Sequence, residues 1–214
     1  MKVVSLYDHS GIMARPWVEA GHEAFAIDII PNTTDDSGVI HLTVNVLDPS
    51  VDILVESADL LFAFPPCTDL AVSGAAHFAA KGPQVRIDAM RLVYRARDLG
   101  ERYAIPYMIE NPVSVIATEW RKPDYYFHPY EYGGYLPEDH VNTEPLIPSK
   151  DAYPKKTCLW VGNGFRIPPI KPVDCPEGYS PQHLYLGGKS ERTKRIRSLT
   201  PEGFARAVYA ANHA

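Results

Sequence analysis

Short apolar runs, bounded by glycine, proline or charged residues, dominate the first half of the chain. Each run has the length of a buried strand, and none is long enough to be an ordinary amphipathic helix. The runs cover residues 3–7, 24–27, 60–64 and 106–109, and the alternation of apolar and polar residues over 39–46 predicts a further strand.

Helical patterns alternate with these runs, over residues 15–20, 48–57 and 85–103. The last is the longest, and its apolar residues Ile87, Met90, Val93 and Tyr94 recur at helical spacing. Strands that alternate with helices through short connections are typical of an α/β fold with a doubly wound parallel sheet.

The pattern loosens between residues 120 and 198, where prolines and aromatic residues dominate. One strand is predicted there, at 157–161, and a helix begins near Thr200 and Pro201. We therefore expect a core over 1–120, a small irregular insert over 121–190, and a C-terminal helix over 191–214 that returns to the core.

Composition limits the class of protein. A chain of 214 residues with 45% hydrophobic residues is long enough for one sizeable domain. Its formal net charge of -5 argues against a sequence-blind coat for nucleic acid, but leaves room for a local basic groove.

The cysteines and the apolar runs indicate a cytoplasmic protein. Three cysteines without a Cys-x-x-Cys pair predict neither a disulfide framework nor a zinc ribbon. The spacing of His128, His183, Cys158 and Cys175 fits no zinc site, so we expect no metal. No stretch approaches the roughly 20 apolar residues of a membrane span, so we expect no membrane partner.

Cys67 is the first candidate for chemistry. Pro65 and Pro66 end the preceding strand, which places Cys67 on a loop at the carboxyl end of a strand, where α/β proteins bind ligands. Glu110 follows the next predicted strand. A thiolate that attacks a conjugated ring needs a proton donor elsewhere on that ring, and a carboxylic acid suits that role. Cys67 can equally be an ordinary half-buried residue, and Glu110 a helix-capping partner.

A cofactor loop is the second candidate. Gly11 follows the first strand and precedes a helix, which allows backbone N–H groups to approach a ligand closely. Asp28 ends the second strand, where an acidic residue accepts hydrogen bonds from the ribose of an adenosine cofactor. The alternative is a turn glycine and a solvated aspartate, because Met13 and Ala14 stand where a Gly-x-Gly-x-x-Gly loop needs glycine.

These residues resemble a known family. Pro66-Cys67, preceded by Phe64-Pro65 and followed by Ser73-Gly74, resembles the Pro-Cys motif of the cytosine-C5 DNA methyltransferases, and Glu110-Asn111-Pro112 is similar to their Glu-Asn-Val motif. The chain is most similar to the short phage-type members. Further segments match motifs of the family in the same order: Ser5 through Gly11 with Ala20-Gly21, Ala26-Ile27-Asp28, and Arg197-Ser198-Leu199-Thr200-Pro201-Glu202 with Arg206.

The resemblance implies a Rossmann-like methyltransferase sheet with S-adenosylmethionine as the methyl donor, bound by the core over 1–120. It implies that Cys67 adds to C6 of cytosine while Glu110 holds or protonates N3, so that C5 takes the methyl group. The cofactor pocket would include Tyr7, Ser10, Gly11, Asp28, Asn45, Val46 and Pro65.

The sequence departs from the family pattern in several places. The Gln-x-Arg-x-Arg motif is missing, and Lys155 and Lys156 occupy the corresponding place. No Gly-Asn-Ser-Val motif follows the last helix. The insert over 121–190 replaces the large target-recognition domain.

The insert bears on the substrate. Its aromatic residues can stack on bases, and Arg192, Arg195 and Arg197, in a basic run that begins at Lys189, can hold phosphates. Alternatively the aromatic residues pack an irregular flap and the basic run is a solvated face. We expect DNA as the substrate and a monomer or weak dimer. The alternatives are the same chemistry on a free pyrimidine nucleotide, or a catalytically silent nucleotide- or DNA-binding protein. The aromatic residues are Tyr125, Tyr126, Phe127, Tyr130, Tyr132 and Tyr135.

Overall fold

The structure, a computed structural model, describes residues 1–72, 81–176, 178–187 and 190–213. Contacts within the chain group it into two units. Unit 1 comprises residues 1–126 and 157–165, and unit 2 comprises residues 127–156 and 166–214. This grouping differs from the three expected parts, because 157–165 belongs with the sheet and the C-terminal helix belongs with unit 2.

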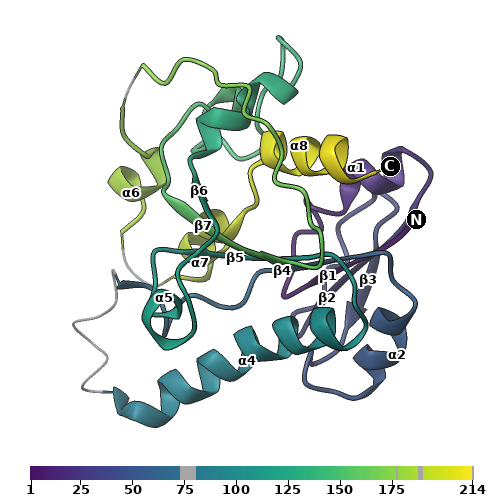
Figure 1. The fold of residues 1–214 in the computed structure, drawn as a ribbon. Helices are drawn as coiled ribbons and strands as arrows, with labels where there is room; N and C mark the ends of the chain where they lie inside the picture. The colour runs from purple at the N-terminus through teal and green to yellow at the C-terminus, as the bar shows by residue number, and fades with distance from the viewer. Residues whose placement is uncertain (73–80, 177, 188–189, 214) are drawn as a thin grey trace. The chain divides into compact units, whose positions relative to one another are not determined.

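A seven-stranded sheet in the order β3-β2-β1-β4-β5-β7-β6 organises the fold (Figure 1). The first five strands in this order are parallel, and β7 runs antiparallel to β5. The predicted α/β class and doubly wound sheet are therefore confirmed. The strands are β1 (Lys2–Leu6), β2 (Glu23–Asp28), β3 (Ile40–Thr43), β4 (Leu60–Ala63), β5 (Tyr107–Pro112), β6 (Tyr125–Phe127) and β7 (Thr157–Gly162).

Helices cover both faces of the sheet in unit 1. On one face α2 and α4 bury apolar side chains such as Val55 and Val93 against Leu61, and each such burial stabilises the fold by about 1.5–3 kcal/mol. On the other face Trp17 of α1 lies 6.1 Å from the ring of Phe62. The helices of this unit are α1 (Arg15–Glu19), α2 (Ser50–Glu56), α4 (Pro83–Arg102) and α5 (Ile116–Glu119).

β5 extends further than the apolar pattern predicts. The pattern places a strand at 106–109, whereas β5 continues to Pro112. The reason is tertiary: β7 pairs along the full length of β5, with Glu110 opposite Leu159 and Pro112 opposite Thr157. Proline is tolerated because β4 pairs with β5 only as far as Ile109, so that at Pro112 the strand has a neighbour on one side only.

Unit 2 has an aromatic core beneath its C-terminal helix. The rings of Phe127 and Phe204 stack with centroids 4.2 Å apart, and the ring of Tyr132 lies 5.2 Å from that of Phe204. Buried Asp151 accepts a hydrogen bond of 2.8 Å from the N–H of Gly203, in the first turn of α8. The elements are η2 (Pro129–Tyr135), η3 (Ser149–Asp151), α6 (Pro181–Tyr185), α7 (Glu191–Ser198) and α8 (Glu202–Asn212).

Candidate active site

The candidate site lies in unit 1, where the strand order reverses between β1 and β4. The chain leaves β1 toward β2 on one side and leaves β4 toward β5 on the other. In open α/β sheets, ligands bind in the crevice at this reversal, beyond the carboxyl ends of the strands. The loops that follow β1 and β4 carry most of the site residues predicted from the sequence.

A buried amide ties the cysteine loop to β5. Nδ2 of Asn111, a residue only 1% exposed, donates a hydrogen bond of 2.8 Å to the carbonyl of Pro65. Further along the same two segments, the N–H of Val115 donates to the carbonyl of Leu70 at 2.9 Å. These bonds fix the Pro-Pro-Cys loop against the segment that contains the Glu-Asn-Pro motif.

Cys67 and Glu110 lie on these two connected segments. Cys67 is exposed, and its carbonyl accepts the N–H groups of Leu70 and Ala71 at 3.0 and 2.8 Å, which closes a turn directly after it. Glu110 is half-buried and follows Ile109, the residue that pairs with Ala63 at the end of β4. Ser73 and Gly74, the last residues of the predicted Pro-Cys motif, lie outside the described residues.

Asp8 organises the loop after β1. This side chain is 4% exposed and accepts hydrogen bonds from the hydroxyls of Ser5 and Ser10, at 2.8 and 2.9 Å, and from the N–H of Gly11 at 2.8 Å. Sequence reasoning missed this role. The signal was an aspartate three residues before a glycine, a pattern typical of side chains that fold back on their own backbone.

Gly11 and Tyr7 adopt left-handed backbone conformations. Gly11 has φ of 68°, and a Cβ at this position would lie 3.0 Å from the ring of His41. Tyr7 has φ of 58°, and its hydroxyl donates to the carbonyl of Leu92 in α4 at 3.0 Å. Burial raises the pKa of the Tyr7 hydroxyl, so it stays protonated. The residues in place of the missing glycines, Met13 and Ala14, are fully buried and pack in the core.

Asp28 lies where the family pattern predicts it, at the end of β2. One carboxylate oxygen accepts the N–H of Ile30 at 2.9 Å. Burial raises the pKa of this carboxyl, and the hydrogen bond from Ile30 offsets part of that effect. The side chain is half-buried at the sheet edge, where a ribose hydroxyl can reach it.

Asn45 and Val46 begin the connection between β3 and α2. The side chain of exposed Asn45 accepts the N–H of Leu47 at 3.0 Å. The carbonyl of buried Val46 accepts a hydrogen bond of 3.0 Å from Nε of Arg95. Both residues therefore belong to a connection that is fixed to α4.

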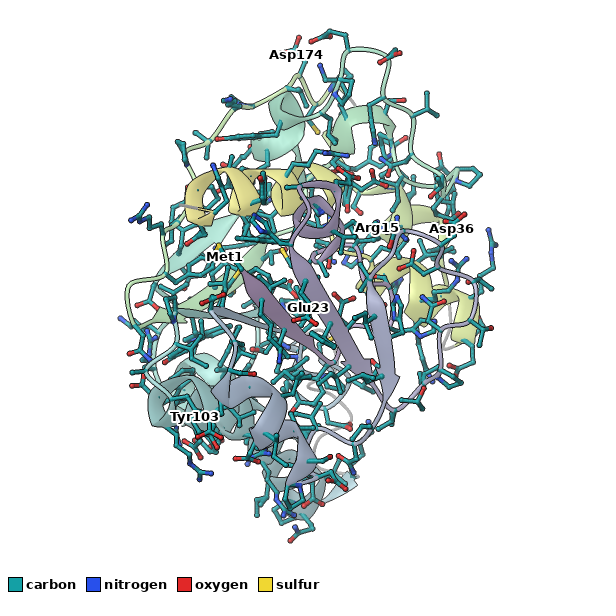
Figure 2. The ribbon with its side chains drawn as sticks, turned by 90° about the vertical axis from the view of Figure 1, so that its right-hand side faces the viewer. Met1, Arg15, Glu23, Asp36, Tyr103 and Asp174 are labelled. Atoms are coloured by element: carbon teal, nitrogen blue, oxygen red, sulfur yellow. The ribbon has the colours of Figure 1, made fainter. Side chains whose placement is uncertain are left out.

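The buried carboxylate of Asp35 lies next to Gly11, on the outer side of the loop that follows β1. Asp35 accepts hydrogen bonds from Nε2 of His41 at 2.7 Å and from the hydroxyl of Ser37 at 2.9 Å, and Arg15 lies 3.4 Å away. Burial alone would raise the pKa of Asp35, but the hydrogen bonds from His41 and Ser37 outweigh it and lower the pKa. Figure 2 shows this region, with Arg15 at the start of α1 and Asp36 in the loop between β2 and β3.

The remaining predicted site residues belong to unit 2. Nζ of Lys155 donates to the carbonyl of Arg197 at 2.8 Å, near the end of α7, and Lys156 is exposed. Arg192 and Arg195 lie 3.8 and 3.4 Å from the carboxylate of Glu144, and Arg197 donates to the carbonyl of Leu186. The basic run is therefore held partly by contacts within its own unit.

The six aromatic residues predicted to stack on bases differ in exposure, and Tyr125, Tyr130 and Tyr135 are half-buried. Phe127 and Tyr132 are 1% and 0% exposed, so they pack the core of unit 2 and cannot stack on bases. Tyr126 is 47% exposed and remains accessible.

No group of three or more His, Cys, Asp or Glu side chains suited to a metal ion occurs within the described ranges. Over the same part of the chain, no helix is both long and apolar enough to cross a membrane.

Neither the comparison with protein families nor the comparison with curated proteins identifies a relative. No protein-family model matches the sequence, and no curated protein matches it.

Proposed function

We propose that the chain transfers a methyl group from S-adenosylmethionine to C5 of cytosine in DNA, through a covalent adduct with Cys67. The observation that carries the proposal is the hydrogen bond between Asn111 and the carbonyl of Pro65. It joins the two segments that resemble the Pro-Cys and Glu-Asn-Val motifs, so that a thiol and a carboxyl group reach the same edge of the sheet.

The residues of the site suit the steps of this reaction. The Cys67 thiolate forms a bond to C6 of the ring, and the Glu110 carboxyl group protonates N3 as negative charge builds up there. C5 then becomes nucleophilic and forms a bond to the methyl carbon, whose bond to sulfur breaks. Water takes the C5 proton, the electrons of the C5–H bond re-form the C5–C6 double bond, and the bond between Sγ and C6 breaks to restore the thiolate. The N3 proton returns to the Glu110 carboxylate, which releases neutral methylcytosine.

The loop after β1 suits an adenosine cofactor. S-adenosylmethionine, when bound, supplies the methyl group as an electrophile. Gly11 shapes the turn of this loop through its left-handed conformation, and a Cβ there would meet the ring of His41 at 3.0 Å. Asp28, half-buried at the end of β2, suits the ribose hydroxyls.

DNA is the favoured substrate because the resemblance is to enzymes that act on DNA. A base within a duplex would have to be flipped out of the helix to reach Cys67. A second candidate is the same chemistry on a free pyrimidine nucleotide. The burial of Phe127 and Tyr132 favours it, since fewer aromatic rings remain for stacking on bases.

A mechanism-based inhibitor tests the nucleophile. DNA that contains 5-fluorocytosine cannot lose the substituent at C5, so it should trap a covalent complex with the wild-type protein in the presence of S-adenosylmethionine. The complex should be absent in the Cys67→Ala variant and present in a Cys175→Ala control. A complex that persists in Cys67→Ala would exclude Cys67 as the nucleophile.

A further inference from the structure

A groove along α4 of unit 1 is not used by the proposed chemistry. It has a volume of about 620 Å³, within the range of ligand-binding clefts. Its lining combines apolar side chains with arginines. The lining residues are Leu47, Pro83, Arg86, Ile87, Met90, Arg91, Tyr94, Arg95, Asp98 and Glu119.

Two hydrogen bonds place this part of α4 beside the candidate active site. The hydroxyl of Tyr7, directly after β1, donates to the carbonyl of Leu92. Arg95, which lines the groove, donates to the carbonyl of Val46, in the connection after β3. The groove therefore adjoins the loops at the carboxyl ends of β1 and β3, where the cofactor is proposed to bind.

Two of its arginines are available to an anion. Arg91 is exposed and makes no ion pair with any residue that the structure describes. Arg86 lies 3.6 Å from Glu119 in an ion pair whose side chains are 43% and 42% exposed. Exposed pairs of this kind contribute little stability, so the Arg86 guanidinium can leave Glu119 for a phosphate.

Arg95 has a different role. It contacts both carboxylate oxygens of Asp52 and the carbonyls of Val46 and Asp48, so it forms a fixed wall of the groove. The apolar lining includes Ile87, which is 58% exposed. Exposed arginines and an exposed apolar side chain in the lining of one groove match the phosphates and sugars of a nucleic-acid backbone.

We propose that this groove binds the sugar–phosphate backbone of the DNA substrate, with Arg86 and Arg91 contacting phosphates. The inference rests on the proposed function, since it names how the same substrate is held. It also explains how a chain with a net charge of -5 can bind DNA without a generally basic surface.

The salt dependence of DNA binding tests the groove. Affinity for a fluorescent duplex oligonucleotide would be measured at several salt concentrations for wild type and for the Arg86→Gln/Arg91→Gln double variant. Each phosphate contact contributes about 0.9 to the slope of log K against log salt, so losing one or two contacts should reduce the slope by about 1 to 2. The affinity for S-adenosylmethionine should not change.

A matched control has the same change in charge outside the groove. The Lys122→Gln/Arg166→Gln double variant removes two exposed cations and should keep the wild-type slope. Equal slopes for the two double variants would overturn the inference. So would competition by poly-glutamate as effective as that by unlabelled DNA, because it would indicate a site for any acidic polymer.

The groove and the proposed reaction can fail separately. Wild-type protein that methylates dCMP but binds no oligonucleotide would overturn the groove and leave the chemistry standing. A second outcome is that the slope of log K against log salt falls in the groove variant but not in the control, while wild type transfers no methyl group to any substrate. That outcome would support the groove and overturn the chemistry.

Discussion

Buried polar side chains form hydrogen bonds with backbone groups at three irregular places in this protein. Asn111 donates a hydrogen bond to the carbonyl of Pro65, close to Cys67. Asp8 accepts the N–H of Gly11, and Asp151 accepts the N–H of Gly203 in the first turn of α8. Each satisfies a backbone group that regular secondary structure leaves unpaired. A single substitution at any of these positions should therefore affect a whole segment.

Asn111→Ala should reduce catalysis more than its effect on stability suggests. Loss of the buried bond to Pro65 should cost about 1–3 kcal/mol in the free energy of unfolding. Because Cys67 would lose its fixed position, kcat for methyl transfer should fall about 10- to 100-fold. Urea unfolding and steady-state kinetics measure the two effects.

Asn163→Gly is a suitable control for this variant. It removes an amide that binds the carbonyls of Gly100 and Ile105 at the opposite edge of the sheet, and glycine keeps the φ of 52° that Asn163 adopts. It should lower stability while kcat stays close to that of wild type. An unchanged kcat in Asn111→Ala would contradict a positioning role for Asn111.

Asp151 should make stability depend on pH. Burial raises its pKa to about 6 from an ordinary value of 3.8, despite the hydrogen bonds from Gly203 and Asn142. The folded state therefore holds the proton more tightly than the unfolded state. The contribution to stability is fully present below about pH 3.8 and is lost as pH rises through about 6. The loss should be on the order of 2–3 kcal/mol.

Asp151→Asn should remove this dependence. Asparagine can still accept from Gly203 and tolerates the left-handed φ of 52°, but it does not titrate. The free energy of unfolding of the variant, relative to wild type, should rise between pH 4 and pH 7. An Asp139→Asn control at an exposed position should follow wild type. If the free energy of unfolding of Asp151→Asn also varies with pH in parallel with that of wild type, burial of the Asp151 charge does not cause the pH dependence of stability.

The conformation of the loop after β1 depends on Gly11. Gly11→Ala should lower stability by about 1–2 kcal/mol because of its left-handed φ, and should also push the loop away from His41, which a Cβ would approach to 3.0 Å. We expect the affinity for S-adenosylmethionine to fall at least about tenfold, since a shifted loop no longer fits the cofactor.

Gly21→Ala separates the two effects. Gly21 has φ of 81°, but a Cβ there would meet nothing within 4 Å. The Gly21→Ala variant should have a Tm lowered to a similar extent. Its affinity for S-adenosylmethionine, measured by isothermal titration calorimetry, should be unchanged. A similar loss of affinity in both variants would refute a specific role for the Gly11 loop.

The sequence predicts those elements whose signal is local. The pattern of Met90 and Val93 predicts α4 to within two residues at its start and one at its end, because one face of the helix packs on the sheet. The pattern does not reveal α7, where only Thr193 and Ile196 are buried among charged residues. Its one local signal is Ser190, whose hydroxyl accepts the N–H of Thr193 at 3.2 Å and caps the helix.

At the scale of the whole molecule, long-range pairing sets what local patterns cannot. The sequence predicts residues 157–161 as an isolated strand within an irregular insert, yet β7, which contains them, pairs antiparallel with β5 and joins the sheet. The same limit applies to the site. The positions of Cys67 after β4 and of Glu110 in the neighbouring β5 follow from the order of elements, whereas the bond from Asn111 to Pro65 links residues far apart in sequence.

Methyl transfer with labelled donor tests the central claim most directly. Radiolabelled S-adenosylmethionine would be given separately with duplex DNA, single-stranded DNA and dCMP, to wild type and to the Cys67→Ser variant. The account predicts that duplex DNA becomes labelled at C5 of cytosine and that Cys67→Ser abolishes the labelling. Binding of S-adenosylmethionine without transfer to any of the three substrates would contradict it and would favour a catalytically silent binding protein.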